Sequence, residues 1–213
     1  MKHFKNIEGS LALKHVIKTI QQNKDYLGMV DGEIGDGDHG VNMNKGFSMA
    51  GERIEDQHGF SDASKIIAEA LMDDIGGSMG PLYGSFFKTL WRHSRNLEVI
   101  DARQYLEMLK AATASVMEIG GAKVGDKTLV DTLEPAWVAF EKALDSGSDF
   151  DVALTESVKS AEVGRDSTKE MIAKIGRSAR LGERSRGVLD AGATSSYLII
   201  ESMHTAIRGI LCD

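Results

Sequence analysis

Apolar residues recur at helical spacing along almost the whole chain, and this pattern limits most strongly how the chain can fold. In "SLALKHVIKTIQQNKDYL", leucine, valine and isoleucine return every three or four residues, which places them on one helical face. Only two prolines interrupt the 213 residues, and strands of alternating Val, Ile and Thr are hard to find. We therefore expect an all-α fold with a single domain over residues 1–213. The pattern predicts eight helices, at residues 10–27, 40–56, 62–74, 82–94, 102–119, 127–144, 150–173 and 192–210.

Composition narrows the class of protein. Hydrophobic residues make up 42% of the chain, which allows a sizeable core, and the formal net charge of −7 argues against a nucleic-acid binder. The one cysteine, Cys212, allows no disulfide within the chain and fits a reducing compartment. No apolar run approaches the roughly 18 residues of a membrane span, and the N-terminus lacks the apolar core of a signal peptide. The sequence thus predicts a cytoplasmic protein that binds neither nucleic acid nor membranes.

The connections between the predicted helices alternate in composition. Those after the first, third, fifth and seventh helices hold or adjoin 17 of the 23 glycines, whereas the other three are ordinary polar turns. Short connections favour helices that run up and down in turn, so these four segments would meet at one end of the bundle. We expect the functional site at that rim, where flexible backbone can approach a ligand closely.

The first glycine-rich connection, "VDGEIGDGDHG", concentrates negative charge. Asp31, Asp36 and Asp38 offer hard oxygen ligands of the kind that Mg²⁺, Mn²⁺ and Ca²⁺ prefer. The stretch is not an EF-hand, because no glutamate stands at the twelfth position counted from Asp36. Each aspartate alone could simply cap a helix or make a turn. The three together indicate divalent metal held against a polyphosphate.

Two further segments suit phosphate. His39 and Asn42 begin the next helix and could bond phosphate oxygens; His39 is alternatively a phosphoryl-accepting nucleophile or a polar residue at a helix start. In "GGSMGPLYG", glycines precede a helix with Pro81 expected at its first position. The free amides of such a helix start bind anions, although glycines there also occur in plain packing turns.

The last two glycine-rich connections are candidates for two roles, lining a nucleotide base and neutralising the charge of a phosphoryl group. "GGAKVGDKTLVDTL" could line a nucleotide base, or Asp126 or Thr128 could merely cap the helix that follows. Asp190, before the last helix, is either that helix's cap or a partner for base or ribose. "GRSARLGERSRG" could neutralise charge on a transferred phosphoryl group, or form a solvated basic loop. Its arginines are Arg177, Arg180, Arg184 and Arg186.

Taken together, four stretches resemble a known family. "GDGDHGVNMNKGF", "GGSMGPLYG", "GDKT" and "GRSARLGERSRGVLDAGATSS" are similar to segments of the nucleotide-binding L subunit of dihydroxyacetone kinase. They follow the family's order and span residues 31–196. The resemblance implies an eight-helix antiparallel up-and-down barrel with the nucleotide site at one end.

The resemblance also implies a set of site residues. Asp31, Asp36 and Asp38 would coordinate two Mg²⁺ ions on the phosphates of ADP or ATP, and Arg177 would be catalytic by steadying the transferred charge. Met79 stands where many relatives carry a hydroxyl residue, so a side-chain phosphate contact there is in question. The implied nucleotide contacts are His39, Gly40, Val41, Asn42, Gly77, Ser78, Met79, Gly80, Gly120, Thr128, Leu129, Arg177, Asp190, Ala191 and Gly192.

Partners follow from the same resemblance. Dihydroxyacetone would sit on a separate K subunit, and a phosphohistidine donor protein of the phosphotransferase system would rephosphorylate bound ADP in place. The alternatives are an L-type subunit of an ATP-dependent kinase for dihydroxyacetone or another short sugar, and a nucleotide-loaded adaptor that binds a transcription factor. The sequence leaves open whether the chain forms a homodimer.

Overall fold

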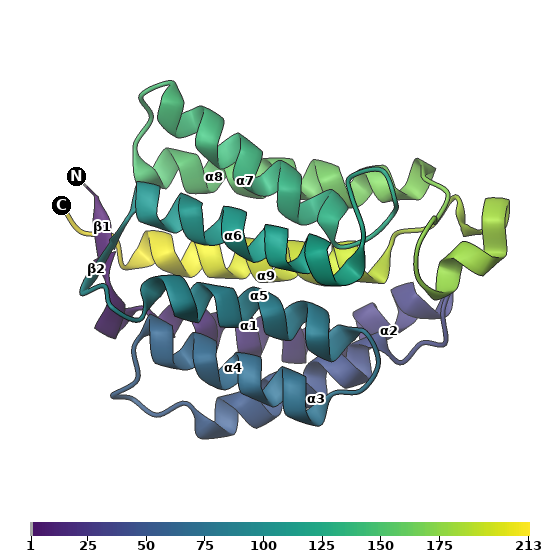
Figure 1. Ribbon diagram of the computed structural model, residues 1–213, viewed down its shortest axis with the longest axis horizontal. Helices are drawn as coiled ribbons and strands as arrows, with labels where there is room; N and C mark the ends of the chain where they lie inside the picture. The colour runs from purple at the N-terminus through teal and green to yellow at the C-terminus, as the bar shows by residue number, and fades with distance from the viewer. Residues whose placement is uncertain (1) are drawn as a thin grey trace.

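The computed structural model describes residues 2–213, and helices make up most of them. They lie side by side with their axes roughly parallel to the long axis of the molecule (Figure 1). No helix within the described range is long and apolar enough to cross a membrane. The α-helices are α1 (Ser10–Gln22), α2 (Lys24–Gly32), α3 (His39–Arg53), α4 (Phe60–Asp74), α5 (Met79–Ser94), α6 (Ala102–Gly120), α7 (Val130–Asp145), α8 (Phe150–Ser167) and α9 (Ala191–Gly209).

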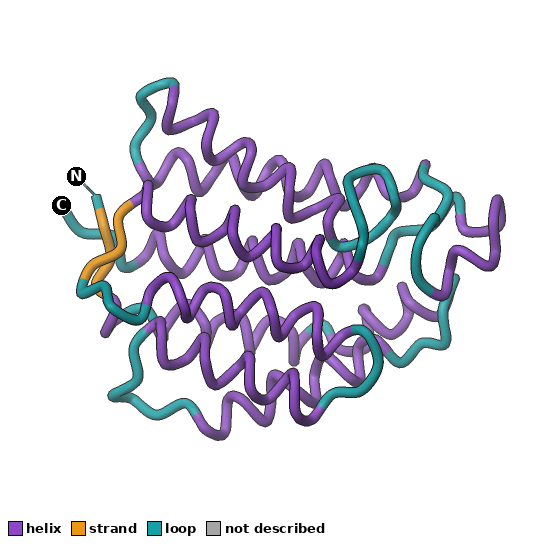
Figure 2. Tube along the Cα trace, in the orientation of Figure 1, coloured by secondary structure: helices purple, strands orange, loops and turns teal. Residues whose placement is uncertain are grey.

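The helices form a closed ring. From α3 to α9 each helix packs against the next one in sequence, α1 packs against α3, and α9 returns to pack against α1. From α2 onwards each connection between α-helices reverses the chain direction, so connections gather at the two ends of the molecule (Figure 2). The expected all-α antiparallel barrel is therefore confirmed.

Aromatic side chains fill much of the ring. The Tyr105 ring lies 5.7 Å from that of Phe150 and 5.9 Å from that of Phe140, measured between ring centroids. Phe4 reaches the same cluster from the N-terminal segment, with its centroid 6.2 Å from that of Tyr105. All four side chains are almost completely buried. Burial of such large apolar areas is the main favourable contribution to folding of a small domain.

Two predicted helices end earlier than their apolar pattern suggests. The helix predicted over residues 10–27 breaks at Asn23, whose side-chain amide donates to the Thr19 carbonyl oxygen at 2.9 Å and competes with the helical bond there. The helix predicted over 150–173 ends at Ser167, and a 3₁₀ turn, Thr168–Glu170, follows. The Thr168 hydroxyl donates to the Arg165 carbonyl oxygen at 2.6 Å at that end. The segments that follow the two breaks contribute Asp31 and Arg177, respectively, to one cavity.

One small β-structure was not expected from the sequence. Strand β1 (His3–Lys5) pairs antiparallel with β2 (Val99–Asp101), and His3 also pairs with Cys212. Strands of three residues are too short to show an alternating pattern. They tie both termini to one end of the barrel, whereas the four glycine-rich connections lie at the other end (Figure 1). The predicted domain starts at residue 1, which lies outside the described residues.

We predict that His204 makes folding sensitive to mild acid. Burial lowers the pKa of this core histidine to about 3, while the nearby Leu154 backbone opposes the shift more weakly. The unfolded chain therefore takes up a proton below about pH 6.5 that the folded chain refuses. The unfolding free energy of the wild type should therefore fall when the pH is lowered from 7 to 5. In His204→Leu this fall should be smaller by about 2 kcal/mol, as measured by urea denaturation at the two pH values.

The exposed His93→Leu variant is the matched control, since solvent reaches that ring in the folded protein. It should lose the same unfolding free energy as the wild type over this pH interval. Equal losses in His204→Leu and the wild type would contradict the prediction.

Candidate functional site

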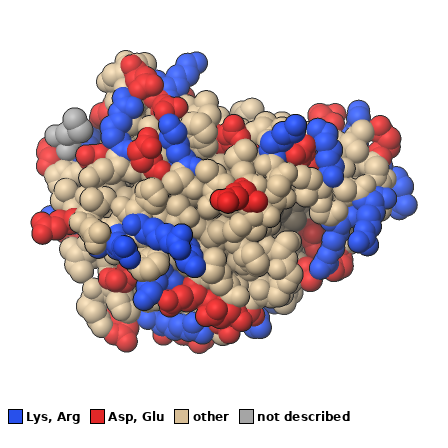
Figure 3. All heavy atoms as spheres, viewed as in Figure 1, with Lys and Arg blue, Asp and Glu red and all other residues tan. Residues whose placement is uncertain are grey.

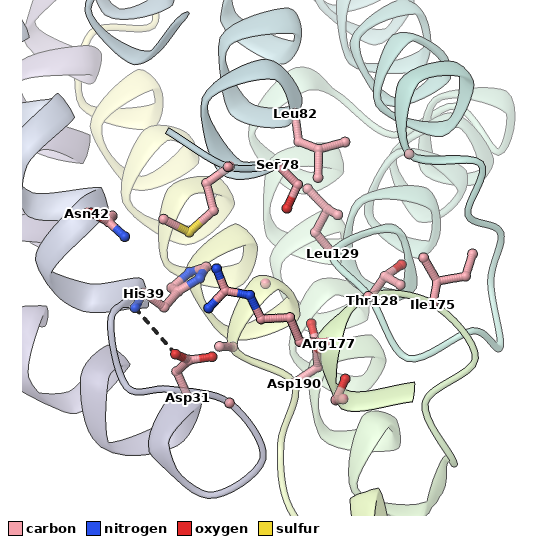
Figure 4. A pocket seen from close by; sticks show the side chains of 18 of the residues that line it. Asp31, His39, Asn42, Ser78, Leu82, Thr128, Leu129, Ile175, Arg177 and Asp190 are labelled. Atoms are coloured by element: carbon pink, nitrogen blue, oxygen red, sulfur yellow. Dashed lines mark hydrogen bonds between the residues drawn. The ribbon is translucent and has the colours of Figure 1, made fainter. Parts of the chain in front are cut away.

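The four glycine-rich connections enclose a cavity of about 660 Å³ at one end of the barrel. This volume is typical of small-molecule sites. Side chains from α2, α3, the α6–α7 connection and the α8–α9 connection point towards it (Figure 4). The rim that the sequence indicated thus contains this cavity. The predicted site residues that line it are Asp31, Asp36, Asp38, His39, Asn42, Gly77, Ser78, Met79, Gly120, Thr128, Leu129, Arg177, Asp190, Ala191 and Gly192.

Three carboxylates cluster on one side of this cavity. Asp31 lies in the last turn of α2, and Asp36 and Asp38 lie in the connection to α3; one oxygen from each falls within 4.8 Å of the others. Asp31 is half-buried and accepts from the His39 backbone N–H at 3.4 Å, whereas the other two are exposed. Like charges this close repel one another. Oxygen ligands of this number and exposure fit Mg²⁺, which completes its shell with water and phosphate oxygens.

Arg177 crosses to the carboxylates from the α8–α9 connection. Its guanidinium pairs with Asp36 and lies 4.0 Å from Asp38. Figure 3 shows basic and acidic side chains together at this end of the molecule. Of the three neighbouring arginines, Arg186 pairs with Glu183 at 3.4 Å, and Arg180 and Arg184 have no ion pair among residues 2–213. Arg177 is thus the arginine of this segment that lines the cavity.

Two helices begin at the cavity without a side-chain cap. The N-terminus of α3 follows Asp38 and that of α5 follows Ser78, and neither residue's side chain caps its helix. Gly77 supplies the positive φ of 73° that turns the chain into α5. The helix begins at Met79, so Pro81 occupies its third position and not the expected first. The uncapped amides and the helix dipoles make this wall of the cavity favourable for anions.

His39 is fixed by a buried hydrogen-bond network. Its Nε2 lies 2.9 Å from the Ser195 hydroxyl on α9, which lies 2.6 Å from the Tyr83 hydroxyl on α5. Burial lowers the pKa of His39 to about 4, and the nearby Asp31 opposes this shift. The imidazole is therefore neutral at pH 7, when it can donate one hydrogen bond and accept another. Tyr83 and Ser195 stand within two of the quoted glycine-rich stretches, but neither was named as a site residue, because their link to His39 is formed only across the fold.

Three predicted contact residues do not line the cavity. A β-carbon at Gly40 would overlap the Lys24 carbonyl oxygen, so this glycine allows α3 to pack closely on α2. Gly80 packs in the same way against the Ile75 carbonyl. The Val41 side chain is 54% exposed, on the outer face of α3. The nucleotide contacts proposed for these three residues remain predictions.

The wall of the cavity around Leu129 is mainly apolar. Leu129 is joined there by Leu82, Ile119 and Ile175, which the motifs did not single out. Apolar side chains of this size suit the flat face of a nucleotide base.

Asp131 braces the α6–α7 connection. Its buried carboxylate accepts from the Gly125 N–H at 2.5 Å and from the Thr128 N–H at 2.7 Å. The spacing T-x-x-D from Thr128 was a detectable capping signal for this residue. Of the two caps that the sequence suggested, Asp126 accepts from the Lys123 N–H at 3.0 Å within the loop, and the Thr128 hydroxyl accepts from the Val130 N–H at 3.2 Å at the start of α7.

Asp190 performs the capping role that the sequence suggested for it. Its carboxylate accepts from the Ala193 N–H at 2.8 Å at the start of α9. Burial raises the pKa of Asp190 to about 6, although the bond from Ala193 acts in the opposite direction. The residue also lines the cavity. Capping and a ligand contact are therefore geometrically compatible.

Fold and site together define an all-helical barrel with a cavity suited to a metal-bound phosphate compound. The DAK2 domain family matches residues 33–205, so the chain belongs to that family. The chain is 38% identical over 187 residues to a protein of Lactococcus lactis named PTS-dependent dihydroxyacetone kinase, ADP-binding subunit DhaL, covering 86% of this chain and 88% of that protein.

Longer proteins match as well. An L-erythrulose kinase of Pectobacterium atrosepticum is 32% identical over 201 residues, which cover 92% of this chain but 34% of that enzyme. The crystal structure of the C. freundii dihydroxyacetone kinase in complex with AMP-PNP and Mg²⁺ superposes with a TM-score of 0.69 at 22% identity. This match covers 93% of our chain and 33% of the other. The chain therefore spans about a third of the length of these two kinases.

We predict that Asp36 contributes to divalent metal binding. Asp36→Asn removes one charge from the cluster, so the apparent Mg²⁺ Kd should weaken by about tenfold or more. The Kd follows from the rise in Tm with Mg²⁺ concentration. Asp56→Asn, an exposed aspartate at the opposite end of the barrel, is the control and should retain the wild-type response. An unaltered response in Asp36→Asn would contradict the metal assignment.

A second prediction concerns the packing that places Asp31. Gly40→Ala forces α3 away from α2 because the added methyl overlaps backbone, and it should cost about 1–3 kcal/mol of unfolding free energy. Since α2 carries Asp31, the Mg²⁺ response should weaken too. Gly51→Ala on the same helix meets only the Ile17 side chain at 3.3 Å and should change stability by less than about 1 kcal/mol. Urea denaturation that gives equal values for the two variants would refute the packing argument.

Proposed function

We propose that this chain is the nucleotide-binding L-type component of a dihydroxyacetone kinase. It would hold Mg-ADP in the rim cavity, accept a phosphoryl group from a phosphohistidine donor protein, and pass it to dihydroxyacetone on a separate K subunit. The observation that carries the proposal is the meeting of three carboxylates, two uncapped helix starts and Arg177 in one cavity. The name and the nearly full-length match of the Lactococcus lactis protein support it.

The groups that line the cavity would divide metal binding, phosphate binding and charge stabilisation among them. Asp31, Asp36 and Asp38 would hold two Mg²⁺ ions, which supply charge neutralisation for the phosphate oxygens. The starts of α3 and α5 would bind those oxygens through backbone amides. Arg177, close to the carboxylates, would stabilise the charge of the transferred group. The neutral His39 suits a hydrogen-bonding role towards phosphate.

A different short sugar is the second candidate. It is favoured by the L-erythrulose kinases of Pectobacterium atrosepticum and Mycolicibacterium smegmatis, which are 32% and 30% identical to this chain. The chain covers 34% of each enzyme, so each name describes a protein about three times as long as the matched region. Turnover of dihydroxyacetone and L-erythrulose with a cognate K subunit would discriminate the two substrates.

We predict that ADP accompanies the purified protein in near-stoichiometric amount. A coenzyme that is rephosphorylated in place should exchange slowly and survive desalting. Acid extraction followed by chromatography measures the released nucleotide, and Asp36→Ala should release little because its metal site is incomplete. Asp56→Ala is the control and should retain the wild-type amount.

Other results would revise the proposal. An empty protein that turns over free ATP with a K subunit would replace the phosphohistidine donor with ATP. A protein that neither retains nor binds any nucleotide in the presence of Mg²⁺ would overturn the proposal.

A further inference from the structure

Lys127 is an unusual residue at the edge of the cavity. It lies in the α6–α7 connection, its side chain is 1% exposed, and its backbone adopts a left-handed φ of 61°. It is the one residue other than glycine with positive φ among the described residues. Left-handed backbone is costly for a long side chain and persists where the surroundings enforce it. The fold therefore holds this lysine in a strained conformation with its ammonium inside the protein.

The ammonium bonds backbone carbonyls and no carboxylate. Its Nζ donates to the carbonyl oxygens of Thr168 at 2.7 Å, Ser185 at 2.6 Å and Val188 at 2.7 Å, and a fourth, that of Met171, lies at 3.4 Å. Among residues 2–213 it forms no ion pair. An ammonium has three N–H donors, and the three close carbonyls use them all. A direct phosphate contact would require breaking one of these bonds.

All four acceptors belong to one segment, residues 168–190, which we name the strap. Its incoming leg, residues 168–175, supplies two of the carbonyls, and its outgoing leg, residues 185–190, supplies the other two. The legs are also joined directly: the Ala173 N–H donates to the Ser185 hydroxyl at 2.9 Å, and the Gly187 N–H to the Lys169 carbonyl at 2.7 Å. The ammonium thus sits where the legs meet.

The tip of the strap carries Arg177. This tip consists of residues 176–184, and two of its glycines have positive φ, Gly176 (78°) and Gly182 (54°). The Arg177 side chain is 64% exposed and pairs with Asp36 across the cavity. With so little packing of its own, the tip takes its position from the legs. Whatever fixes the legs therefore determines where Arg177 can reach.

We propose that Lys127 is a positioning residue that clamps the two legs of the strap and so sets Arg177 at the carboxylate cluster. It acts through the strap and does not touch the nucleotide. The clamp itself stands on the geometry alone, whereas its effect on phosphoryl transfer rests on the proposed function. Removing the ammonium leaves the carbonyl oxygens of Ser185 and Val188 without a hydrogen-bond donor among residues 2–213, while the Thr168 carbonyl keeps its bond from the Met171 N–H at 3.2 Å. The two lost partners belong to the outgoing leg, so their loss favours separation of the legs.

Limited trypsin digestion of the full chain tests the clamp directly. The strap contains Arg177, Arg180, Arg184 and Arg186, so its opening exposes trypsin sites. In Lys127→Met, cleavage after these arginines should accelerate by about tenfold or more, well below the Tm. Lys174→Met is the matched control, because this exposed strap lysine contacts Asp126 and the Gly125 carbonyl from outside. It should change the rate by less than about twofold.

A second readout separates positioning from general stability. In Lys127→Met the Kd for Mg-ADP should stay within about threefold of wild type, while the rate of phosphoryl transfer falls by about tenfold or more. A residue that binds nucleotide would instead weaken Kd and transfer together. If Lys127→Met does not fold, Lys127→Gln, which retains two N–H donors, should give the same pattern with smaller changes.

The outcomes are decisive in both directions. Strap-selective cleavage with retained Mg-ADP affinity supports the clamp. Unchanged cleavage overturns it, as does cleavage that rises throughout the chain in step with a lowered Tm. A parallel loss of Kd and transfer also overturns it. If the wild type transfers no phosphoryl group, the proposed function fails, yet the digestion still decides whether Lys127 holds the strap.

Discussion

Closure of the helix ring by α9 packing on α1 is the constraint on which the rest of this structure depends. Once the ring is closed with alternating helix directions, every second connection lies at the same end. Four connections separated by up to about 140 residues in sequence then surround one space. The carboxylates come from the end of α2 and the connection that follows it, and the guanidinium comes from the last of these connections. Closure of the ring brings the two together.

The glycines at this rim fall into two structural classes, those with positive φ and those that allow close backbone packing. Gly77 supplies a backbone conformation with positive φ that other residues adopt only with strain. Gly40 and Gly80 instead lack a side chain where another backbone passes, and Gly164 does the same for α8 against the Asp131 carbonyl. Close packing at these glycines is structural, but at Gly40 and Gly80 it also determines where the uncapped helix starts of α3 and α5 lie at the cavity. A motif rich in glycine therefore combines packing positions with positions that face a ligand.

Two cations beside the cavity differ in what surrounds them. Arg177 is exposed and pairs with carboxylates, so solvent screens its interactions and its side chain can move. Lys127 is enclosed by carbonyl oxygens, and burial lowers its pKa, with Asp190 opposing that shift. The exposed cation suits contact with a transferred group. The buried one suits holding the backbone that presents it.

The sequence by itself determined the helices, their approximate ends and the segments that form the cavity. Helical periodicity and glycine punctuation are local, because each depends on neighbours within a few residues. It also singled out Asp31, Asp36, Asp38 and Arg177, whose charges stand out in their segments. It did not show the break at Asn23, the short strands, or that Gly40 and Gly80 face other helices.

Only the tertiary structure decided which polar groups meet across the chain. Lys127 reaches carbonyls 41 to 61 residues further on, and His39 meets Ser195 across 156 residues. Backbone carbonyls carry no mark in the sequence, because every residue has one. A lysine that binds them therefore looks like any surface lysine until the ring closes. The sequence specified which groups are present, and long-range packing decided which of them became partners.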